Sequence, residues 1–139
     1  MDLNGCGCPG FSLTEKYRDA IINIYDNIGK LKFESYQYKD FQEIISKNGI
    51  SKESEIRMIV PFFRKAKIIS QNSYQLNGDR ICKLTISSNF FTQAGHIFIT
   101  LLKLNKNNKE LNNQSIKDVI ERLYENICFL IFIYRYKSS

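Results

Sequence analysis

Apolar residues recur along this chain at two spacings, and each spacing predicts a different kind of element. Over 13–28 they recur every three or four residues, which is the period of one face of a helix. Ser12 and Glu15 have the spacing of a capping box, with Ser12 as the N-cap. Gly29 follows at the position where helices commonly end. We therefore expect a first helix over 13–28.

Two more helices, separated by a tight turn, are predicted in the middle of the chain. The first covers 38–47 and ends at Asn48-Gly49, because both residues tolerate a left-handed backbone. Ser51 is a favourable N-cap for the next helix, over 52–66. Pro61 lies inside that helix, removes one backbone hydrogen bond and should bend the last turns. The apolar positions of this helix are Ile56, Ile59, Val60, Phe63 and Ala66.

Three stretches alternate between apolar and polar residues and predict strands. Residues 31–36 form a short one, and 74–76 with 81–86 form a β-ribbon whose tip is Asn77-Gly78. Strict alternation in the last strand places Ile81, Lys83 and Thr85 on one side and Cys82, Leu84 and Ile86 on the other.

The chain ends in two predicted helices. Thr92 is the expected N-cap of a helix over 93–104, and Ser115 caps a final helix over 116–135. The last turns of the final helix, 127–134, are apolar nearly all round, so they need burial on more than one side. The apolar positions expected in the helix over 93–104 are Ala94, Ile97, Phe98, Leu101 and Leu102.

The order of these elements over 13–102 resembles the winged helix-turn-helix superfamily of DNA-binding proteins. The most specific part is 38–76. Two residues depart from the family's pattern: Lys67, where the family often has Gly, and Pro61. The residues that carry the resemblance there are Phe41, Ile44-Ile45, the turn Lys47-Asn48-Gly49-Ile50, the run Ser51-x-x-Ser54-x-x-Arg57, Ile59, Phe63, Lys67-Ile68-Ile69 and Tyr74-Gln75-Leu76.

The resemblance implies an α+β, mostly helical fold: a winged helix-turn-helix with an added C-terminal helix. Residues 1–11 would be an irregular lead-in, 12–104 the domain, and 115–137 the added helix, through which two copies would pair. It also implies that the helix over 52–66 lies in the major groove of DNA. The ribbon would then touch the backbone or the minor groove.

The net charge of +6 is concentrated in one part of the chain. Residues 1–50 hold six Lys or Arg and seven Asp or Glu, whereas 51–110 hold ten and four. Basic charge focused on one segment is the footprint of a polyanionic partner such as DNA. A lysine-rich solvated surface would give the same excess, so charge alone leaves both interpretations open.

Side chains that could touch DNA lie in three places. On the helix over 52–66, long or polar side chains can reach base edges or phosphates, and Arg57 could bind guanine through two hydrogen bonds. The alternative for Arg57 is a surface ion pair with a glutamate. Tyr38 can instead belong to the core. The full set of candidate DNA-binding residues is Lys52, Ser54, Glu55, Arg57, Arg64 and Lys65 on this helix, Asn77, Arg80 and Lys83 on the ribbon, and Tyr38 and Lys39 at the N-terminal edge of the helix over 38–47.

Other kinds of chemistry have little support in the sequence. The chain has no Gly-rich phosphate loop, no nucleophile elbow and no recognisable pair of catalytic carboxylates, so we expect neither an enzyme nor a cofactor. Cys6 and Cys8 are spaced one residue too closely for a zinc knuckle, and His96 has no partner at ligand spacing, so no metal is expected. No run is long enough to span a bilayer and no secretory signal is evident, which predicts a cytoplasmic protein.

Double-stranded DNA is therefore the expected partner, bound by a homodimer that acts as a transcriptional regulator or in DNA maintenance. Two alternatives stay open. One is a winged-helix module that binds protein, suggested by Glu53, Glu55 and the aromatic residues Phe62, Phe63, Phe90 and Phe91. The other is the DNA-reading subunit of a larger nuclease or replication assembly.

Overall fold

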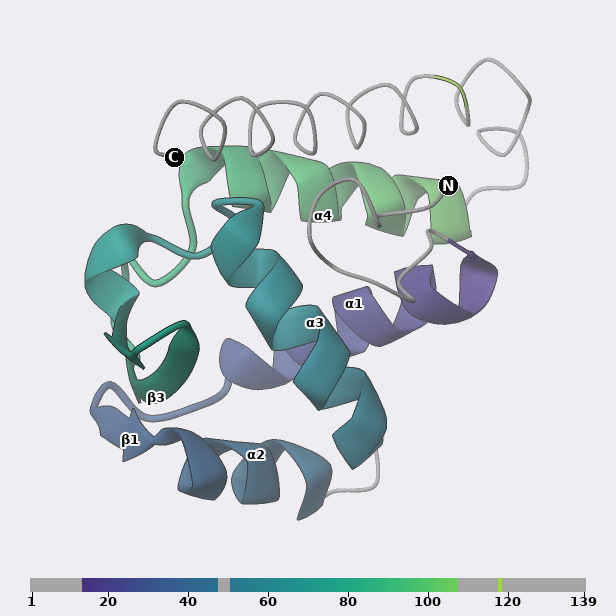
Figure 1. The fold of residues 1–139 in the computed structure, drawn as a ribbon. Coiled ribbons are helices and arrows are strands. Elements are labelled where there is room, and N and C mark those ends of the chain that lie inside the picture. Colours follow the sequence, from purple (N-terminus) through teal and green to yellow (C-terminus); the bar gives the residue numbers. More distant parts are fainter. Residues whose placement is uncertain (1–13, 48–50, 108–117, 119–139) are drawn as a thin grey trace.

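The computed structural model describes residues 14–47, 51–107 and 118, and within them the fold is α+β and mostly helical. Helix α3 crosses the middle of the molecule, with α4 on one side, α2 on the other and α1 behind (Figure 1). The elements are α1 (Glu15–Ile28), β1 (Ser35–Gln37), α2 (Tyr38–Lys47), α3 (Glu53–Lys65), the 3₁₀ turn η2 (Gln71–Ser73), β2 (Tyr74–Asn77), β3 (Arg80–Thr85) and α4 (Gln93–Asn107).

The N-terminal helix forms as predicted, but another residue begins it. The hydroxyl of Thr14 accepts a hydrogen bond from the backbone N–H of Tyr17 at 3.3 Å, so Thr14 is the N-cap, and Ser12 lies outside the described residues. Gly29 does end α1, with a right-handed φ of −63°, so its left-handed freedom is not used there.

Helices α2 and α3 confirm the predicted elements, with one correction. The N-cap of α3 is Lys52, and the predicted cap Ser51 is buried instead. The carboxylate of Glu55 accepts from the backbone N–H of Lys52 at 3.3 Å, which satisfies a donor at the helix start. The apolar side of α3 is buried as expected, and Pro61 lies within the helix.

The three described strands form an antiparallel sheet in the order β1-β3-β2. The predicted strand 31–36 is wrong in position, because β1 starts only at Ser35. Phe33 is 71% exposed, whereas Tyr36 is buried and pairs with Leu84 of β3. Alternation alone could not set this register, since the pairing with β3 determines which short stretch becomes the strand.

A bulge in β3 changes the predicted faces of the ribbon. Gln75 pairs with Lys83 and Leu76 with Ile81, so Cys82 is an extra residue between them. Ile81 is therefore buried on the same side as Leu84, and the strict alternation that placed it opposite is wrong.

The tip of the hairpin is Gly78-Asp79, one residue later than expected, since Asn77 pairs with Arg80. Gly78 has a φ of +63°, which a residue with a Cβ rarely adopts. A positive φ at the first central residue alone is the sign pattern of a type II′ hairpin turn.

Helix α4 begins as predicted and buries a different face. The hydroxyl of Thr92 accepts from the backbone N–H of Gly95 at 3.0 Å, which confirms Thr92 as the N-cap. Ile99 is buried although the prediction omitted it, and Ile97, predicted to be in the apolar face, is 51% exposed.

The end of α3 and the start of α4 are joined by a dense set of bonds. The hydroxyl of Thr92 donates to the carbonyl of Lys67 at 2.7 Å, and its backbone N–H donates to that of Ile68 at 2.9 Å. Gly95 lies so close to Ile68 that a Cβ there would be 2.5 Å from its carbonyl oxygen. Lys67 has a φ of +57°, so this chain places a lysine in a left-handed position.

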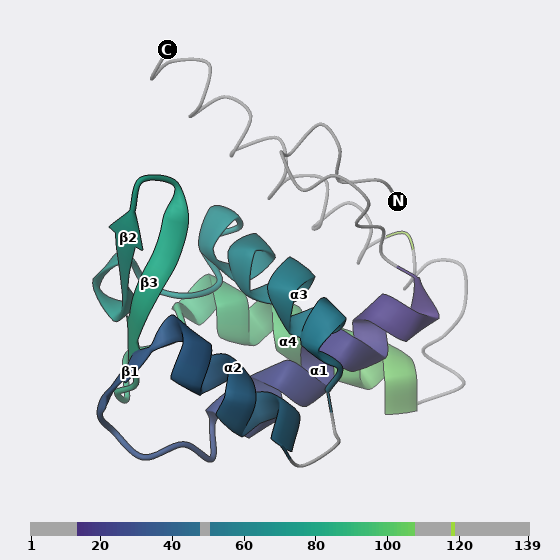
Figure 2. The same ribbon diagram turned by 60° about the horizontal axis from the view of Figure 1, so that its bottom comes forward.

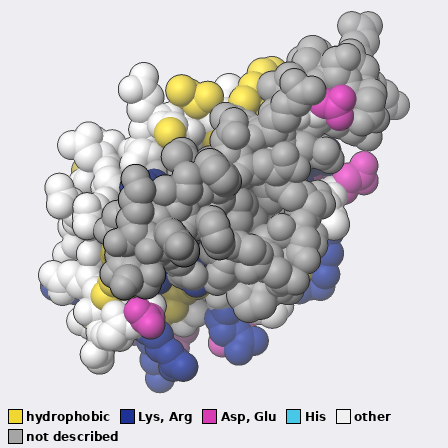
Figure 3. All heavy atoms as spheres, turned by 45° about the horizontal axis from the view of Figure 1, so that its top comes forward, with side chains coloured by type: hydrophobic (Ala, Val, Ile, Leu, Met, Phe, Trp, Pro, Cys, Tyr) yellow, Lys and Arg dark blue, Asp and Glu magenta, His cyan; other side chains and the backbone are white. Residues whose placement is uncertain are grey.

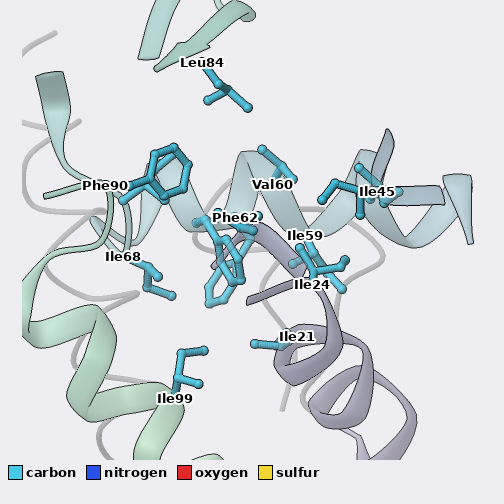
Figure 4. Close-up of a cluster of buried hydrophobic side chains, with 14 of the residues drawn as sticks. Ile21, Ile24, Ile45, Ile59, Val60, Phe62, Ile68, Leu84, Phe90 and Ile99 are labelled. Atoms are coloured by element: carbon cyan, nitrogen blue, oxygen red, sulfur yellow. The ribbon is translucent and has the colours of Figure 1, made fainter. Parts of the chain in front are cut away.

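Side chains from every helix and from the sheet meet in one core. Figure 4 shows Ile21 and Ile24 of α1, Phe62 of α3 and Ile99 of α4 gathered on one side of α3, while Val60 lies on the side toward the sheet. Leu84 of β3 covers this cluster from the sheet side (Figure 4). The predicted regions 1–11 and Asn48-Gly49, and all but one residue of 115–137, lie outside the described residues.

The close approach at Gly95 predicts an unusual sign for a glycine substitution. In most helix positions, Gly→Ala stabilises by about 0.5–1 kcal/mol. We expect Gly95→Ala to lower the free energy of unfolding by about 1–3 kcal/mol, because the new methyl group must displace the backbone of Ile68. Gly29→Ala is the control, since its Cβ would meet only ordinary contacts at 3.4 Å. Urea unfolding followed by circular dichroism measures both, and equal stabilities would contradict the packing.

The left-handed lysine gives a second prediction. Lys67→Gly should be more stable than Lys67→Ala by about 1 kcal/mol, because only glycine accepts this φ without strain. The matched pair is Glu43→Gly and Glu43→Ala at an exposed position of α2, where glycine should be the less stable residue by about 1 kcal/mol. Thermal unfolding of the four variants tests this, and the same sign in both pairs would show that Lys67 is unstrained.

Candidate nucleic-acid interface

The side of α3 that faces away from the core carries basic side chains. We call Ser54, Arg57, Arg64 and Lys65 the outer face of α3; Ser54 and Arg57 are exposed and the other two are half-buried. None of the described residues forms a hydrogen bond or an ion pair with Arg57, so the glutamate pair that was its alternative does not form among them. Arg57 is exposed in the described part of the chain, where a long side chain at this position can reach an external partner.

The start of α3 contributes less than the sequence suggested. Lys52 is exposed and can approach a phosphate, as a cation beside a helix N-terminus. Glu55 is half-buried, and its carboxylate is already bound to the backbone N–H of Lys52. We therefore assign Glu55 a capping role in this structure. Ser51, with its hydroxyl buried, does not reach the surface.

Arg64 connects the outer face of α3 to the hairpin. Its Nη2 donates to the carbonyl of Asp79 in the turn at 3.3 Å. The hairpin of β2 and β3 stands beside the end of α3 (Figure 2), and this bond links the two in addition to the core packing of Ile81 and Leu84. The helix end and the tip thus lie side by side, and exposed arginines are found on both elements, Arg57 on the helix and Arg80 on the tip.

The ribbon residues lie on a different side of the sheet from the core. Lys83 neighbours buried Leu84, so it points to the opposite face, together with its pairing partners Gln37 and Gln75. Asn77 and Arg80 pair with each other at the exposed end of the same side. We call these five residues the outer sheet face. It meets the outer face of α3 at the hairpin tip, and Lys83 lies on the far side of the sheet from α3.

The two candidates in the first turn of α2 are in different environments. Lys39 is exposed. Tyr38 stacks on Phe41 with ring centroids 6.2 Å apart, and its hydroxyl is buried without a hydrogen-bond partner in the described part of the chain. Burial raises the pKa of Tyr38 to about 12, and the side chain of Gln42, which is near the hydroxyl without reaching hydrogen-bond geometry, partly opposes this rise. Tyr38 is thus half-buried and packs against the core, with its hydroxyl inside.

A hollow that no sequence pattern indicated lies near the end of α1. It encloses about 450 Å³ between α1, the 86–91 loop and α4. His96 is placed there by a hydrogen bond of 2.5 Å between its Nδ1 and the hydroxyl of Tyr25, and it packs against Phe91 with ring centroids 5.6 Å apart. Its role in this structure is thus to hold aromatic side chains together at the rim of the hollow.

Metal and membrane features can be assessed only for the described ranges. In 14–47, 51–107 and 118, no three His, Cys, Asp or Glu side chains come together as a metal site requires. No helix in that part of the chain combines the length and hydropathy needed to cross a bilayer. Cys6, Cys8 and Cys128 lie outside it.

The buried hydroxyl of Tyr38 predicts a pH dependence of stability. The folded protein keeps this proton up to about pH 12, whereas the ordinary pKa is 10.0. Between these values the unfolded chain has released a proton that the folded chain still holds, so stability falls as the pH rises. We expect wild type to lose roughly 1–2 kcal/mol more than Tyr38→Phe between pH 9.5 and 11.5.

Urea unfolding at each pH measures this difference. At pH 7 both states keep the proton, and there Tyr38→Phe should be at least as stable as wild type, because it removes an unpaired buried hydroxyl. Parallel pH profiles of the two proteins would contradict the burial of this group.

Comparison with known proteins adds no relative to this description: no protein-family model, no curated protein and no solved structure matches the chain. The residues and geometry above are therefore the basis for any functional assignment.

Proposed function

We propose that this protein binds double-stranded DNA, with α3 in the major groove and the hairpin of β2 and β3 against the neighbouring backbone. Its biological role would be transcriptional regulation or DNA maintenance. The assignment rests on the basic side chains of the outer face of α3 and of the hairpin tip, two elements that Arg64 links through its 3.3 Å bond to Asp79.

The arrangement of elements supports this proposal. Helix, strand, helix, helix and hairpin follow one another, and β1 pairs with β3 so that the sheet lies beside α2 and α3 (Figure 2). This order resembles the winged helix-turn-helix proteins, in which the helix corresponding to α3 enters the major groove. The fold class and the location of the basic surface point to the same helix.

The charge distribution supports it as well. Residues 51–85 hold seven Lys or Arg and three Asp or Glu. One of the acids, Glu55, is engaged at the start of α3, and Asp79 offers its backbone carbonyl to Arg64. Arg57 is exposed on the helix and Arg80 at the tip. Cations on α3 and on the hairpin tip can thus contact the groove and the phosphate backbone of one duplex at the same time.

The alternative of a module that binds protein and not DNA was suggested by two glutamates of α3 and by four aromatic residues. The positions of the aromatic residues no longer support it. Phe62, Phe63 and Phe90 are buried, and Phe91 packs against Tyr25 with ring centroids 4.5 Å apart. These aromatic rings therefore form the core and its edge, and they do not present an apolar docking surface. Among the described residues, the surface beside them on α3 is basic.

Pairing of two copies is part of the proposal. Two α3 helices would enter successive major grooves about 34 Å apart if a twofold axis relates the copies. The segment expected to pair them, 115–137, lies almost wholly outside the described residues. Sedimentation equilibrium with and without a palindromic duplex is the direct measurement of this arrangement.

Fluorescence anisotropy with labelled mixed-sequence duplexes of about 20 base pairs tests DNA binding itself. The affinity should fall steeply as salt rises, because bound phosphates release counterions. Arg57→Ala should weaken binding by about 1–3 kcal/mol and relax base preference, since it removes a contact to base edges. Arg80→Ala and Lys83→Ala should weaken binding to all sequences alike and lower the salt slope by about one each.

Lys30→Ala is the control, because it removes one exposed charge at the end of α1, outside both surfaces. Tyr38→Phe should bind like wild type. Absence of binding at low salt, or equal effects of Arg57→Ala and Lys30→Ala, would overturn the proposal.

A further inference from the structure

Helix α4 uses two of its sides within the described fold. One side enters the core through Phe98, Ile99 and Leu102. The second side faces α1, where Lys103 binds Asp26 at 2.7 Å. On that side Lys106 also approaches Asp19 at 3.8 Å, and Asn105 accepts from Arg18 at 2.7 Å.

The third side of α4 is apolar. Ile97, Leu101 and Leu104 follow one another at helical spacing and form what we call the apolar stripe. Ile97 is 51% and Leu104 47% exposed, while Leu101 is half-buried against the core. Hydrophobic side chains reach the surface on the face of the molecule that Figure 3 presents. A stripe of this kind gains free energy from any apolar surface that covers it.

The sequence after α4 has a complementary pattern. The predicted helix over 116–135 follows Asn107 after the polar stretch 108–115, a length typical of connections between antiparallel neighbouring helices. If that connection turns the chain back along α4, apolar residues of the segment come opposite the stripe in reverse order: Val119 opposite Leu104, Leu123 opposite Leu101, and Ile127 opposite Ile97.

We propose that residues 116–131 of the same chain pack antiparallel along α4 and cover the apolar stripe. The covalent connection raises the effective concentration of this segment at α4 to the millimolar range, which a second copy reaches only at comparable protein concentration. The proposal does not depend on DNA binding. It leaves the remaining apolar side of 127–134 for contact with a second copy.

Engineered cysteines test which chain covers the stripe. The test protein carries Leu101→Cys and Leu123→Cys, and its control carries Leu101→Cys and Glu121→Cys, which places the second thiol two residues earlier and so on another side of the predicted helix. Both are made in a background without native thiols: Cys6→Ser, Cys8→Ser, Cys82→Ala and Cys128→Ala. Mild oxidation followed by non-reducing electrophoresis and peptide mapping identifies the disulfide.

We expect a disulfide within one chain, formed about tenfold faster in the test protein than in the control, because only facing positions meet the geometry of a disulfide. A disulfide between chains would show that a second copy covers the stripe. Equal rates in both proteins would show that the segment does not pack there. Either of the last two results overturns the proposal.

Hydrogen exchange provides a readout with the native cysteines in place. Ile97→Ser and Leu104→Ser change exposed positions, so the core should stay folded. Amides of 116–131 should be protected in wild type and should exchange about tenfold faster in the double variant. Absence of protection in wild type, or protection that the double variant keeps, would also overturn the proposal.

Discussion

The bonded junction between α3 and α4 is the constraint on which the arrangement of this molecule depends. The carbonyls of Lys67 and Ile68 accept from Thr92, and the absence of a side chain at Gly95 lets α4 approach the backbone of Ile68. Since α4 is also bound to α1 through ion pairs, the orientation of α3 is fixed from its C-terminal end. The outer face of α3 therefore belongs to a helix whose C-terminal end is tied to α4 and, through α4, to α1.

Arg64 links the hairpin to α3. This side chain is half-buried between the helix and the turn, and its bond to Asp79 couples their positions. A basic surface assembled in this way presents Arg57 and Arg80 in a set relation, which lowers the entropy that ordering them on a polyanion would cost. Arg64 thus acts on the proposed interface through position, whether or not it touches a phosphate itself.

Sequence patterns located the helices well and the details of the sheet poorly, for a physical reason. A helix such as α3 is encoded locally, because residues three and four apart share a face and bury together. The position of β1 and the bulge at Cys82 depend on pairing with a distant strand, which no local pattern reports. In the candidate interface, Arg57 was identifiable from its helix position, whereas the burial of Tyr38 required tertiary contacts. The capping role of Glu55 is local, but it depends on α3 beginning after Lys52 and not after the predicted cap Ser51.

The bulge at Cys82 decides where the charge of the hairpin points. Because Cys82 is an extra residue between Ile81 and Lys83, Arg80 and Lys83 lie on the same outer side of the sheet although two residues, and not one, separate them. If Cys82 were instead paired regularly in the ladder, the part of β3 before it would turn over. Arg80 would then face the helices and Ile81 the water, so the polarity of the whole tip depends on one extra residue in β3.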